Sequence, residues 1–182
     1  QNNINSKILV LDRSYKNKNN ENVILFKPEN FFFYRIKNYI AKILDYLTRN
    51  NCQNSFNFFS SGLSSLINKM DVDIVNLHWI NNSMMSIKDI GKIEKKIVWT
   101  LHDMWPFCGT EHFSYLNYYR DGYSDLSKLD INKFVWKKKF KNFHNKINYI
   151  SPSSWMHSCA KSSSILKNMS SKKIPYPIDF DI

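Results

Sequence analysis

The chain has 182 residues, 43% of them hydrophobic and 15% aromatic, which excludes a disordered composition and is enough to bury a core. A formal charge of +11, from 26 Lys and Arg against 15 Asp and Glu, favours anionic partners. Three widely spaced cysteines argue against a secreted disulfide framework, and no signal peptide or run of about 18 apolar residues is present. We therefore expect a cytoplasmic protein.

The first part of the chain predicts two short strands followed by helices. Residues 6–12 (SKILVLD) form a β-branched apolar run, and residues 23–26 (VILF) form a second run that stops before Pro28. Apolar residues then recur at three- and four-residue spacing over 31–50, which predicts an amphipathic helix. Residues 63–69 predict one or two further helical turns.

The middle of the chain alternates strand, helix and strand. Residues 73–79 (DIVNLHW) and 96–103 (KIVWTLHD) each read as a buried strand that ends in polar residues. Between them, residues 86–93 predict a short helix with Ser86 as its N-cap and Asp89 in its first turn. This alternation predicts a parallel sheet with right-handed crossovers.

The remaining segment continues the same pattern after a long aromatic loop at 104–127. Residues 131–146 predict a strongly basic helix, 147–151 a strand, and 153–162 a helix capped by Ser153 or Ser154. The stretch KKIPYPID reads as a short strand that enters a Pro-rich loop. The predicted fold class is α/β, with a Rossmann-like parallel sheet and flanking helices in a single domain over residues 1–182.

Three predicted strands end in side chains that can bind or react. His78 and Trp79 end one strand, His102 and Asp103 end the next, and the strand at 147–151 is followed closely by Ser153. Ligands of open parallel sheets bind beyond the carboxyl ends of the strands. Adjacent strands would bring these residues into one rim.

Each of these residues also has a purely structural interpretation. A histidine such as His102 can stabilise a developing anion or transfer a proton near neutral pH, but a His beside an Asp is more often structural. Asp103 can serve as a turn or cap residue. Trp79, Trp105 and Phe107 could form an apolar platform for a sugar ring, although such residues more often pack in a core or loop.

The lysines of the basic helix fit either of two readings. They could place the helix on an anionic bilayer, or they could be the solvent face of an ordinary outer helix, which we favour. The lysines concerned are Lys133, Lys137, Lys138, Lys139 and Lys141. A nucleic-acid-binding role is weak because the charge is diffuse and no recognition motif occurs.

Metal and nucleotide-loop motifs are not found in the sequence. Cys108 and His112, or His157 and Cys159, lack a second matching pair, so we expect no metal site. The chain holds four Gly and has neither a GxGxxG nor a GxxxxGK pattern. We expect no cofactor.

Five blocks in the second half carry a resemblance to a known family. In order they are DIVNLHWI, SIKDI, KKIVWTLHDMWPFCG, ISPSSWMHSCAKSSSILKN and KIPYPIDFDI. Over about residues 71–182 the chain resembles the family 4 glycosyltransferases, retaining enzymes of GT-B fold that build bacterial surface polysaccharides, and is most similar to the colanic-acid-type branch. LHDMWPF between a strand and a Gly is the most specific block, and the likeness before residue 71 is thin.

The resemblance implies a function and a set of site residues. Family members have two Rossmann-like domains, of which the N-terminal one binds the acceptor and the C-terminal one the nucleotide sugar. His102 would face the cleft near the transferred sugar as the catalytic candidate. The substrate-binding candidates are His78, Trp79, Asp103, Trp105 and Ser153. The reaction would be metal-independent sugar transfer to a glycan or lipid-linked acceptor in polysaccharide or lipopolysaccharide synthesis, at the inner face of the cell membrane.

The sequence also departs from the family pattern. The first strand with its Gly-Gly loop, the donor-binding domain with its paired glutamates, and the cysteines that relatives often carry after the Trp-Pro block have no counterpart here. We therefore expect an acceptor-side domain that is inactive alone. The alternative is a truncated remnant that binds a partner, glycan or membrane without turnover.

Overall fold

A computed structural model describes residues 4–11, 21–27, 31–47, 53–143 and 147–177. In this part of the chain, six strands form two parallel sheets. The smaller sheet pairs β1 (Ile8–Leu11) with β2 (Val23–Phe26). The larger sheet has the order β3-β4-β5-β6, with bounds Ile74–Leu77, Lys96–Thr100, Ile147–Ser151 and Ser171–Lys173.

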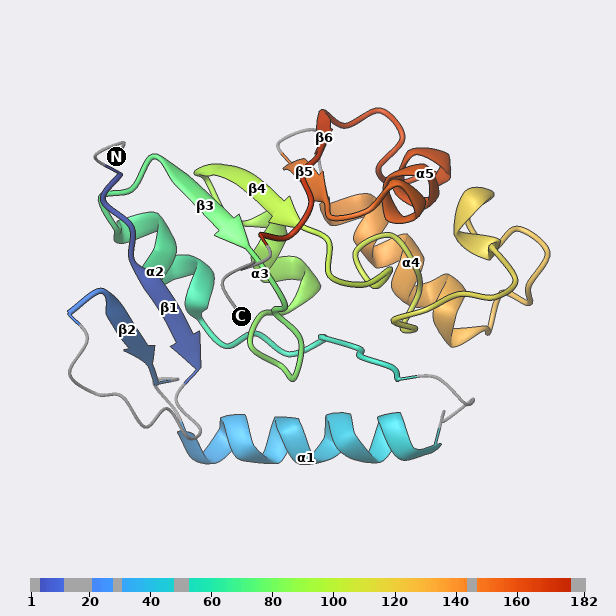
Figure 1. Ribbon diagram of the computed structural model, residues 1–182. Coiled ribbons are helices and arrows are strands. Elements are labelled where there is room, and N and C mark those ends of the chain that lie inside the picture. Colours follow the sequence, from blue (N-terminus) through green and yellow to red (C-terminus); the bar gives the residue numbers. More distant parts are fainter. Residues whose placement is uncertain (1–3, 12–20, 28–30, 48–52, 144–146, 178–182) are drawn as a thin grey trace, which may run out of the picture.

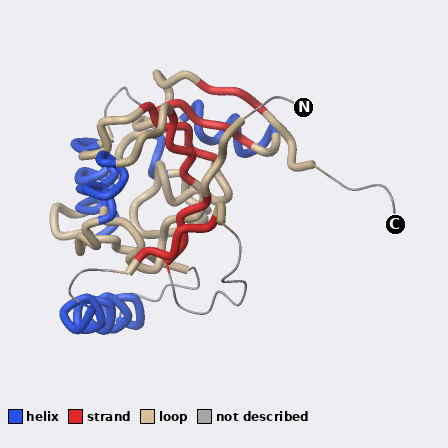
Figure 2. The backbone as a smooth tube through the Cα atoms, turned by 90° about the vertical axis from the view of Figure 1, so that its left-hand side faces the viewer, coloured by secondary structure: helices blue, strands red, loops and turns tan. Residues whose placement is uncertain are grey.

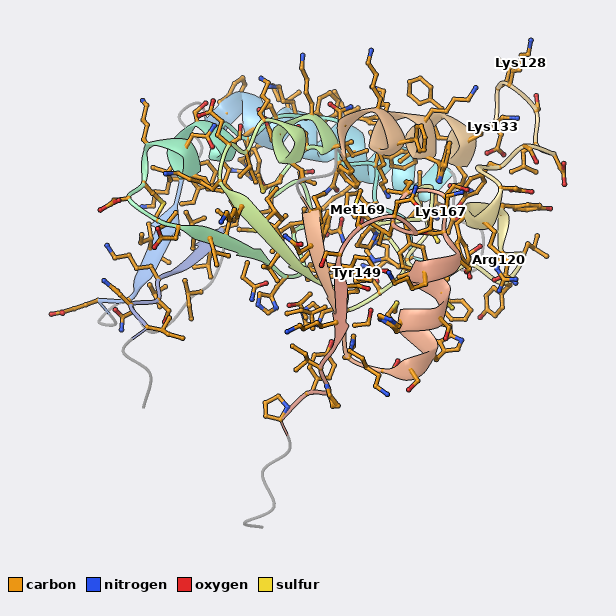
Figure 3. All side chains as sticks on the ribbon, turned by 90° about the horizontal axis from the view of Figure 1, so that it is seen from above. Arg120, Lys128, Lys133, Tyr149, Lys167 and Met169 are labelled. Atoms are coloured by element: carbon orange, nitrogen blue, oxygen red, sulfur yellow. The ribbon has the colours of Figure 1, made fainter. Side chains whose placement is uncertain are left out.

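Helices lie on both sides of the larger sheet. Figures 2 and 3 show helices on both sides of the strands. The first side holds α2 (Leu63–Lys69), α3 (Ile87–Gly91) and α4 (Ile131–Asn142); α5 (Ser154–Ser162) contacts β5 and β6 from the opposite side. The long helix α1 (Phe31–Leu47) runs along the bottom of the molecule in Figure 1. The predicted α/β, Rossmann-like fold class is confirmed.

Most predicted helices and strands are present, and they differ from the prediction mainly in where they end. The strand predicted over 96–103 ends at Thr100: Leu101 N–H still bonds the Ile150 carbonyl at 2.9 Å, but the chain then turns. The basic helix ends at Asn142, while residues 144–146 of the prediction lie outside the described residues. The same holds for residues 48–50 of the predicted first helix. The predicted parallel strands are divided between two sheets.

Side-chain caps fix the starts of three helices. Ser86 is the N-cap of α3 as predicted, and it forms a capping box with Asp89. The buried Asp89 carboxylate also accepts a hydrogen bond from Ser60 Oγ at 2.7 Å. Asp130 caps α4 and Ser153 caps α5, accepting from the backbone N–H three residues later at 2.9 and 3.1 Å. These caps fix where the chain enters each helix after a strand or loop.

The aromatic loop between β4 and α4 belongs to the core. Trp105, Phe107, Tyr119 and Tyr123 are fully buried, and only Tyr118–Arg120 within this segment form a short 3₁₀ helix. Trp105 donates its indole N–H to the Ser55 carbonyl at 2.7 Å, and Tyr123 Oη accepts from Gly109 N at 2.7 Å. The backbone is irregular, as predicted, but its aromatic side chains complete the hydrophobic core.

The prediction that Lys139 belongs to the exposed lysine face of the basic helix is wrong. Lys139 is 0% exposed, and its ammonium donates to the carbonyls of Trp105, Cys108 and Gly109 at 2.5, 3.1 and 2.6 Å. The Nζ atom also lies 3.6 Å from the Trp105 ring centroid. Burial lowers the pKa of Lys139 to about 7. This lysine holds the aromatic loop on α4 and is not available to a membrane surface.

The other lysines of α4 are more accessible. Lys133, labelled in Figure 3, donates to the carbonyls of Ser124 and Leu126 at 2.9 and 2.7 Å. Lys137, Lys138 and Lys141 are exposed. In their case the structure agrees with a solvent-facing position.

Candidate functional site

The carboxyl ends of β3 and β4 bring two histidines into contact. The strands pair in parallel with Leu77 opposite Trp99, so the residues that follow them leave the sheet at the same edge. Nδ1 of His78 lies 2.9 Å from Nε2 of His102, with ring centroids 5.2 Å apart. Both side chains are exposed. Of the three strand ends predicted to form one rim, those of β3 and β4 meet here.

A third residue extends this pair into a hydrogen-bonded row. The segment after β6 runs to the ends of β4 and β3 (Figure 1), and the Tyr176 hydroxyl lies 2.6 Å from Nδ1 of His102. The Tyr176 and His102 rings are 9° from parallel. Two neutral imidazoles satisfy the row when Tyr176 donates to Nδ1 of His102 and Nε2 of His102 donates to His78.

The surroundings shift the pKa values at both ends of the row. Partial burial lowers the pKa of His78, and the neighbouring His102 lowers it further. Burial also raises the pKa of Tyr176, with a smaller contribution from the negative charge of Asp103. Both shifts favour the neutral forms of these two side chains.

Asp103 is held by three neighbours in a separate network. Its Oδ1 accepts from the Trp105 backbone N–H at 3.0 Å, and its Oδ2 accepts from the Trp79 indole N–H at 3.2 Å. Nδ1 of His112 lies 2.5 Å from the same Oδ2. The Trp105 contact is the turn role expected of an Asp at this position. Asp103 therefore fixes the Trp79 indole beside the histidine row.

Ser55 completes a Ser-His-Asp connection with His112 and Asp103. Nε2 of His112 lies 2.9 Å from Ser55 Oγ, the same connectivity as in serine hydrolases. However, Ser55 and His112 are only 6% and 8% exposed, and neither lines the hollow at the strand ends. A nucleophile must reach its substrate. The connection serves instead to anchor Asp103 to the segment before α2.

A shallow hollow lies at this edge of the larger sheet. It is small, with about 190 Å³ of space that is partly open to solvent. Trp99 and Trp105 line it yet are 2% and 0% exposed, so they form its floor. The lining residues are His78, Trp79, Ile80, Asn81, Trp99, Thr100, His102, Asp103, Trp105 and Pro106.

Exposed aromatic side chains gather next to His112 and at the start of α5. Phe113 stacks on Trp155 with ring centroids 5.7 Å apart and an interplanar angle of 15°, and Tyr115 packs edge-on against Phe113 at 4.6 Å. The three side chains are 39%, 51% and 76% exposed, in the order Phe113, Trp155, Tyr115. Phe113 follows His112, which binds Asp103, so this aromatic group adjoins the strand-end network.

The residues singled out in the sequence are only partly gathered here. His78, Trp79, His102 and Asp103 meet at the rim as expected. Trp105 differs from the expectation because its buried ring lies beneath the rim, and Phe107 is packed in the core. Ser153 caps α5 and does not line the hollow.

Sequence reasoning missed Tyr176, His112 and Ser55. Tyr176 lies in a Pro-rich loop, and no sequence pattern predicts where that loop packs. Ser55 is 57 residues from His112, so their contact cannot be inferred from spacing. The one available signal is the side-chain type of His112, which the sequence analysis considers only as a metal ligand.

Neither a metal-binding cluster nor a membrane-spanning helix is found among the described residues. No three His, Cys, Asp or Glu side chains of that part of the chain are grouped so that they could hold a metal ion. Within the same residues, every helix is too short or too polar to cross a bilayer.

Comparison with known proteins identifies no relative. No family model, curated protein or solved structure matches the chain.

Proposed function

We propose that this chain is the acceptor-side domain of a retaining glycosyltransferase that uses a nucleotide-sugar donor to extend a bacterial surface glycan. The observation that carries the proposal is the Tyr176–His102–His78 row at the carboxyl edge of a parallel sheet. The resemblance of the LHDMWPF block to family 4 glycosyltransferases supports the same function. His102 is the catalytic candidate of this proposal.

The contact between Tyr176 and His102 supports a role in binding a sugar hydroxyl. The Tyr176 hydroxyl lies 2.6 Å from Nδ1 of His102, at a site open to solvent. A hydroxyl group of a sugar has the same donor and acceptor capacity as the phenol. We infer that a sugar hydroxyl replaces the Tyr176 hydroxyl when substrate binds, and that His102 then donates to or accepts from it during transfer.

The size of the hollow favours a ligand shared with a second wall. The hollow is too shallow to enclose a disaccharide, since its space of about 190 Å³ is partly open to solvent, so a glycan would lie across the rim. Trp79 offers one exposed apolar face there, and the Phe113–Trp155 stack offers another nearby. Sugar rings stack on such aromatic faces through their apolar C–H surfaces.

The remaining chemistry belongs to the donor-binding domain that the proposal requires. The nucleotide sugar is a substrate, so no separate cofactor is needed, and basic groups of that domain would stabilise the leaving diphosphate. The acceptor is a glycan or lipid-linked glycan at the cytoplasmic face of the membrane. Acting alone, the present chain would bind acceptor without transferring sugar.

A transfer assay tests this proposal. Radiolabelled nucleotide sugars are supplied as a panel, with cell-envelope lipids as acceptor, to this chain alone and to the protein that also includes a donor-binding domain. We expect label in the lipid-linked glycan only in the second case. Binding of envelope glycan without transfer in either case would favour the non-catalytic alternative, and neither binding nor transfer would refute the proposal.

A further inference from the structure

One side chain at the hollow is buried but has no hydrogen bond to its oxygen. Asn81 is 4% exposed and lines the hollow at the strand ends. Its Oδ1 atom accepts no hydrogen bond from any residue that the structure describes. Other described side chains contain such a buried atom, but none of them lines the hollow. Asn81 therefore differs from the others by its position at the candidate site.

A buried amide oxygen without a donor is unfavourable in a folded protein. Burial removes the water that would donate to the oxygen, so nearly all buried polar groups in proteins are hydrogen-bonded. A ligand hydroxyl that donates to Oδ1 would provide this bond. Rotation about the χ2 angle, which is broad in asparagine, allows the amide to present either of its two polar atoms to the hollow.

The backbone next to Asn81 adopts an uncommon conformation. The following residues, Asn82 and Ser83, have φ angles of 53° and 61°. Residues other than glycine seldom adopt this left-handed region, and two in succession need support from the surrounding structure. Backbone strain of this kind is concentrated at functional sites. Here it sets the path of residues 80–85, and therefore the position of Asn81, directly after β3.

Side chains from the segment before α2 supply support for residues 80–85. Asn57 Nδ2 donates to the Met85 carbonyl at 2.9 Å, and Ser61 Oγ donates to the Met84 carbonyl at 2.6 Å. Asn57 is 4% exposed, the same as Asn81. Of these two equally buried amides, one holds the loop by a hydrogen bond, whereas the oxygen of the other accepts none from the described residues.

The other side chains of the hollow indicate the chemistry of the ligand. Trp79 offers an apolar ring face, and His78 and His102 offer ring nitrogens that can donate or accept. Among the described residues, no Lys or Arg lines the hollow, so an anionic group would have no cationic partner there. A neutral ligand with both hydroxyl groups and apolar C–H faces matches this lining, and a sugar has both.

We propose that Asn81 is a specificity-determining residue that binds a hydroxyl group of the sugar at this site. The hydroxyl donates to Oδ1, and an adjacent hydroxyl accepts from Nδ2 of the same amide. Asn81 thereby distinguishes sugars by the positions of their hydroxyl groups. This inference rests on the proposed function, because it names a contact to the same acceptor sugar.

Unfolding of two asparagine variants tests whether the Asn81 amide is needed for the fold. Asn81→Leu replaces the amide with an apolar group of similar size. Asn57→Asp removes the equally buried donor and tolerates the φ of 45° at that position. We expect Asn81→Leu to unfold no more than about 2 °C below wild type, and Asn57→Asp about 4 °C or more below it. Equal losses in the two variants would overturn the proposal, because the Asn81 amide would then support the fold.

Titration with sugars tests the contact itself. The methyl glycosides of glucose, galactose and mannose differ in the configuration of single hydroxyl groups, and each is added to the unmodified full chain. NMR follows the side-chain amide of Asn81 and the imidazoles of His78 and His102. We expect at least one of the three sugars to shift all of these signals. Asn81→Leu should bind that sugar at least about tenfold more weakly and lose the preference among the three.

The titration separates this inference from the proposed function. Shifts at His78 and His102 without a shift at Asn81 would overturn the role of Asn81 and leave the proposed function standing. Equal affinity of wild type and Asn81→Leu for the sugar would do the same. No shift at any of these residues would also overturn this inference, whereas the proposed function is decided by the transfer assay.

Discussion

His78 and His102 share a hydrogen bond between ring nitrogens, so the charge of one ring acts directly on the other. The pKa of His78 is lowered by burial and by His102. Unfolded His78 takes up its proton at a higher pH than the folded residue does. This group therefore makes the free energy of unfolding decrease as the pH falls below about 6.5.

Substitution of His102 should change the titration of His78. In His102→Gln the amide can keep a hydrogen bond but carries no charge, so the pKa of His78 should rise. It should stay below its ordinary value, because burial is the larger cause. Two-dimensional NMR of the imidazole nitrogens against pH measures this shift. His157→Gln on α5 is the control, and an unchanged titration of His78 in His102→Gln would show that the rings are not coupled.

The environment of Lys139 makes a second prediction at this scale. Lys139→Met removes the three donors that satisfy the carbonyls of Trp105, Cys108 and Gly109 in the core. Buried acceptors without partners are costly, so we expect the free energy of unfolding to fall by about 3 kcal/mol or more. Urea denaturation measures it. Lys137→Met, two residues earlier on the exposed side of α4, should change it by less than about 0.5 kcal/mol. Similar effects in both variants would disprove the structural role of Lys139.

His78, His102 and Lys139 show what could and could not be predicted from the sequence at the level of single residues. The pairing of His78 with His102 follows from two strands that end one after the other, and it was predicted. Lys139 was misread because five lysines within nine residues look like a solvent face. Its burial depends on the carbonyls of a loop 30 residues earlier, which no local pattern reveals.

At the scale of elements, the aromatic loop and α4 depend on a close backbone contact. A Cβ atom on Gly109 would lie 2.7 Å from the Asn132 Cα and 2.8 Å from its carbonyl oxygen. Asn132 Oδ1 also accepts from the next residue, Thr110 N, at 2.9 Å. Glycine at this position therefore lets the loop reach the first turn of α4.

Gly109→Ala should consequently destabilise the fold. The methyl group meets backbone atoms that cannot rotate away, and we expect a loss of about 1–3 kcal/mol. Gly62→Asn is a suitable comparison, because Gly62 has φ +82°, no atom within 4 Å of an added Cβ, and a conformation that Asn tolerates. Thermal unfolding measures the stability of the two variants. A Gly109→Ala protein as stable as Gly62→Asn would mean that the contact with Asn132 is easily relaxed.

Element positions were predicted more accurately than element ends. Apolar runs and N-cap residues revealed the strands and helices of the larger sheet, including the Ser86 capping box. The end of β4 at Thr100 was missed, because Leu101 continues the apolar run although the strand has already ended. The separation of β1 and β2 from the larger sheet was also missed, since strand order depends on long-range packing.

At the scale of the whole molecule, the sheet edge and α1 form two distinct surfaces. Sequence periodicity predicted the amphipathic α1, and an apolar face normally turns toward the core. The structure turns that face outward, with Tyr34 binding the fold from the other side. The direction of an amphipathic helix is set by its tertiary contacts, so it was beyond prediction from the sequence.

The central claim is that His102 acts on the transferred sugar, and one rate measures it most directly. Turnover is compared for wild type, His102→Ala and the control His157→Ala in the protein that includes a donor-binding domain. We predict that His102→Ala lowers turnover at least about tenfold, within the range of general acid–base groups, while His157→Ala stays near wild type. Near wild-type turnover in His102→Ala would contradict the account.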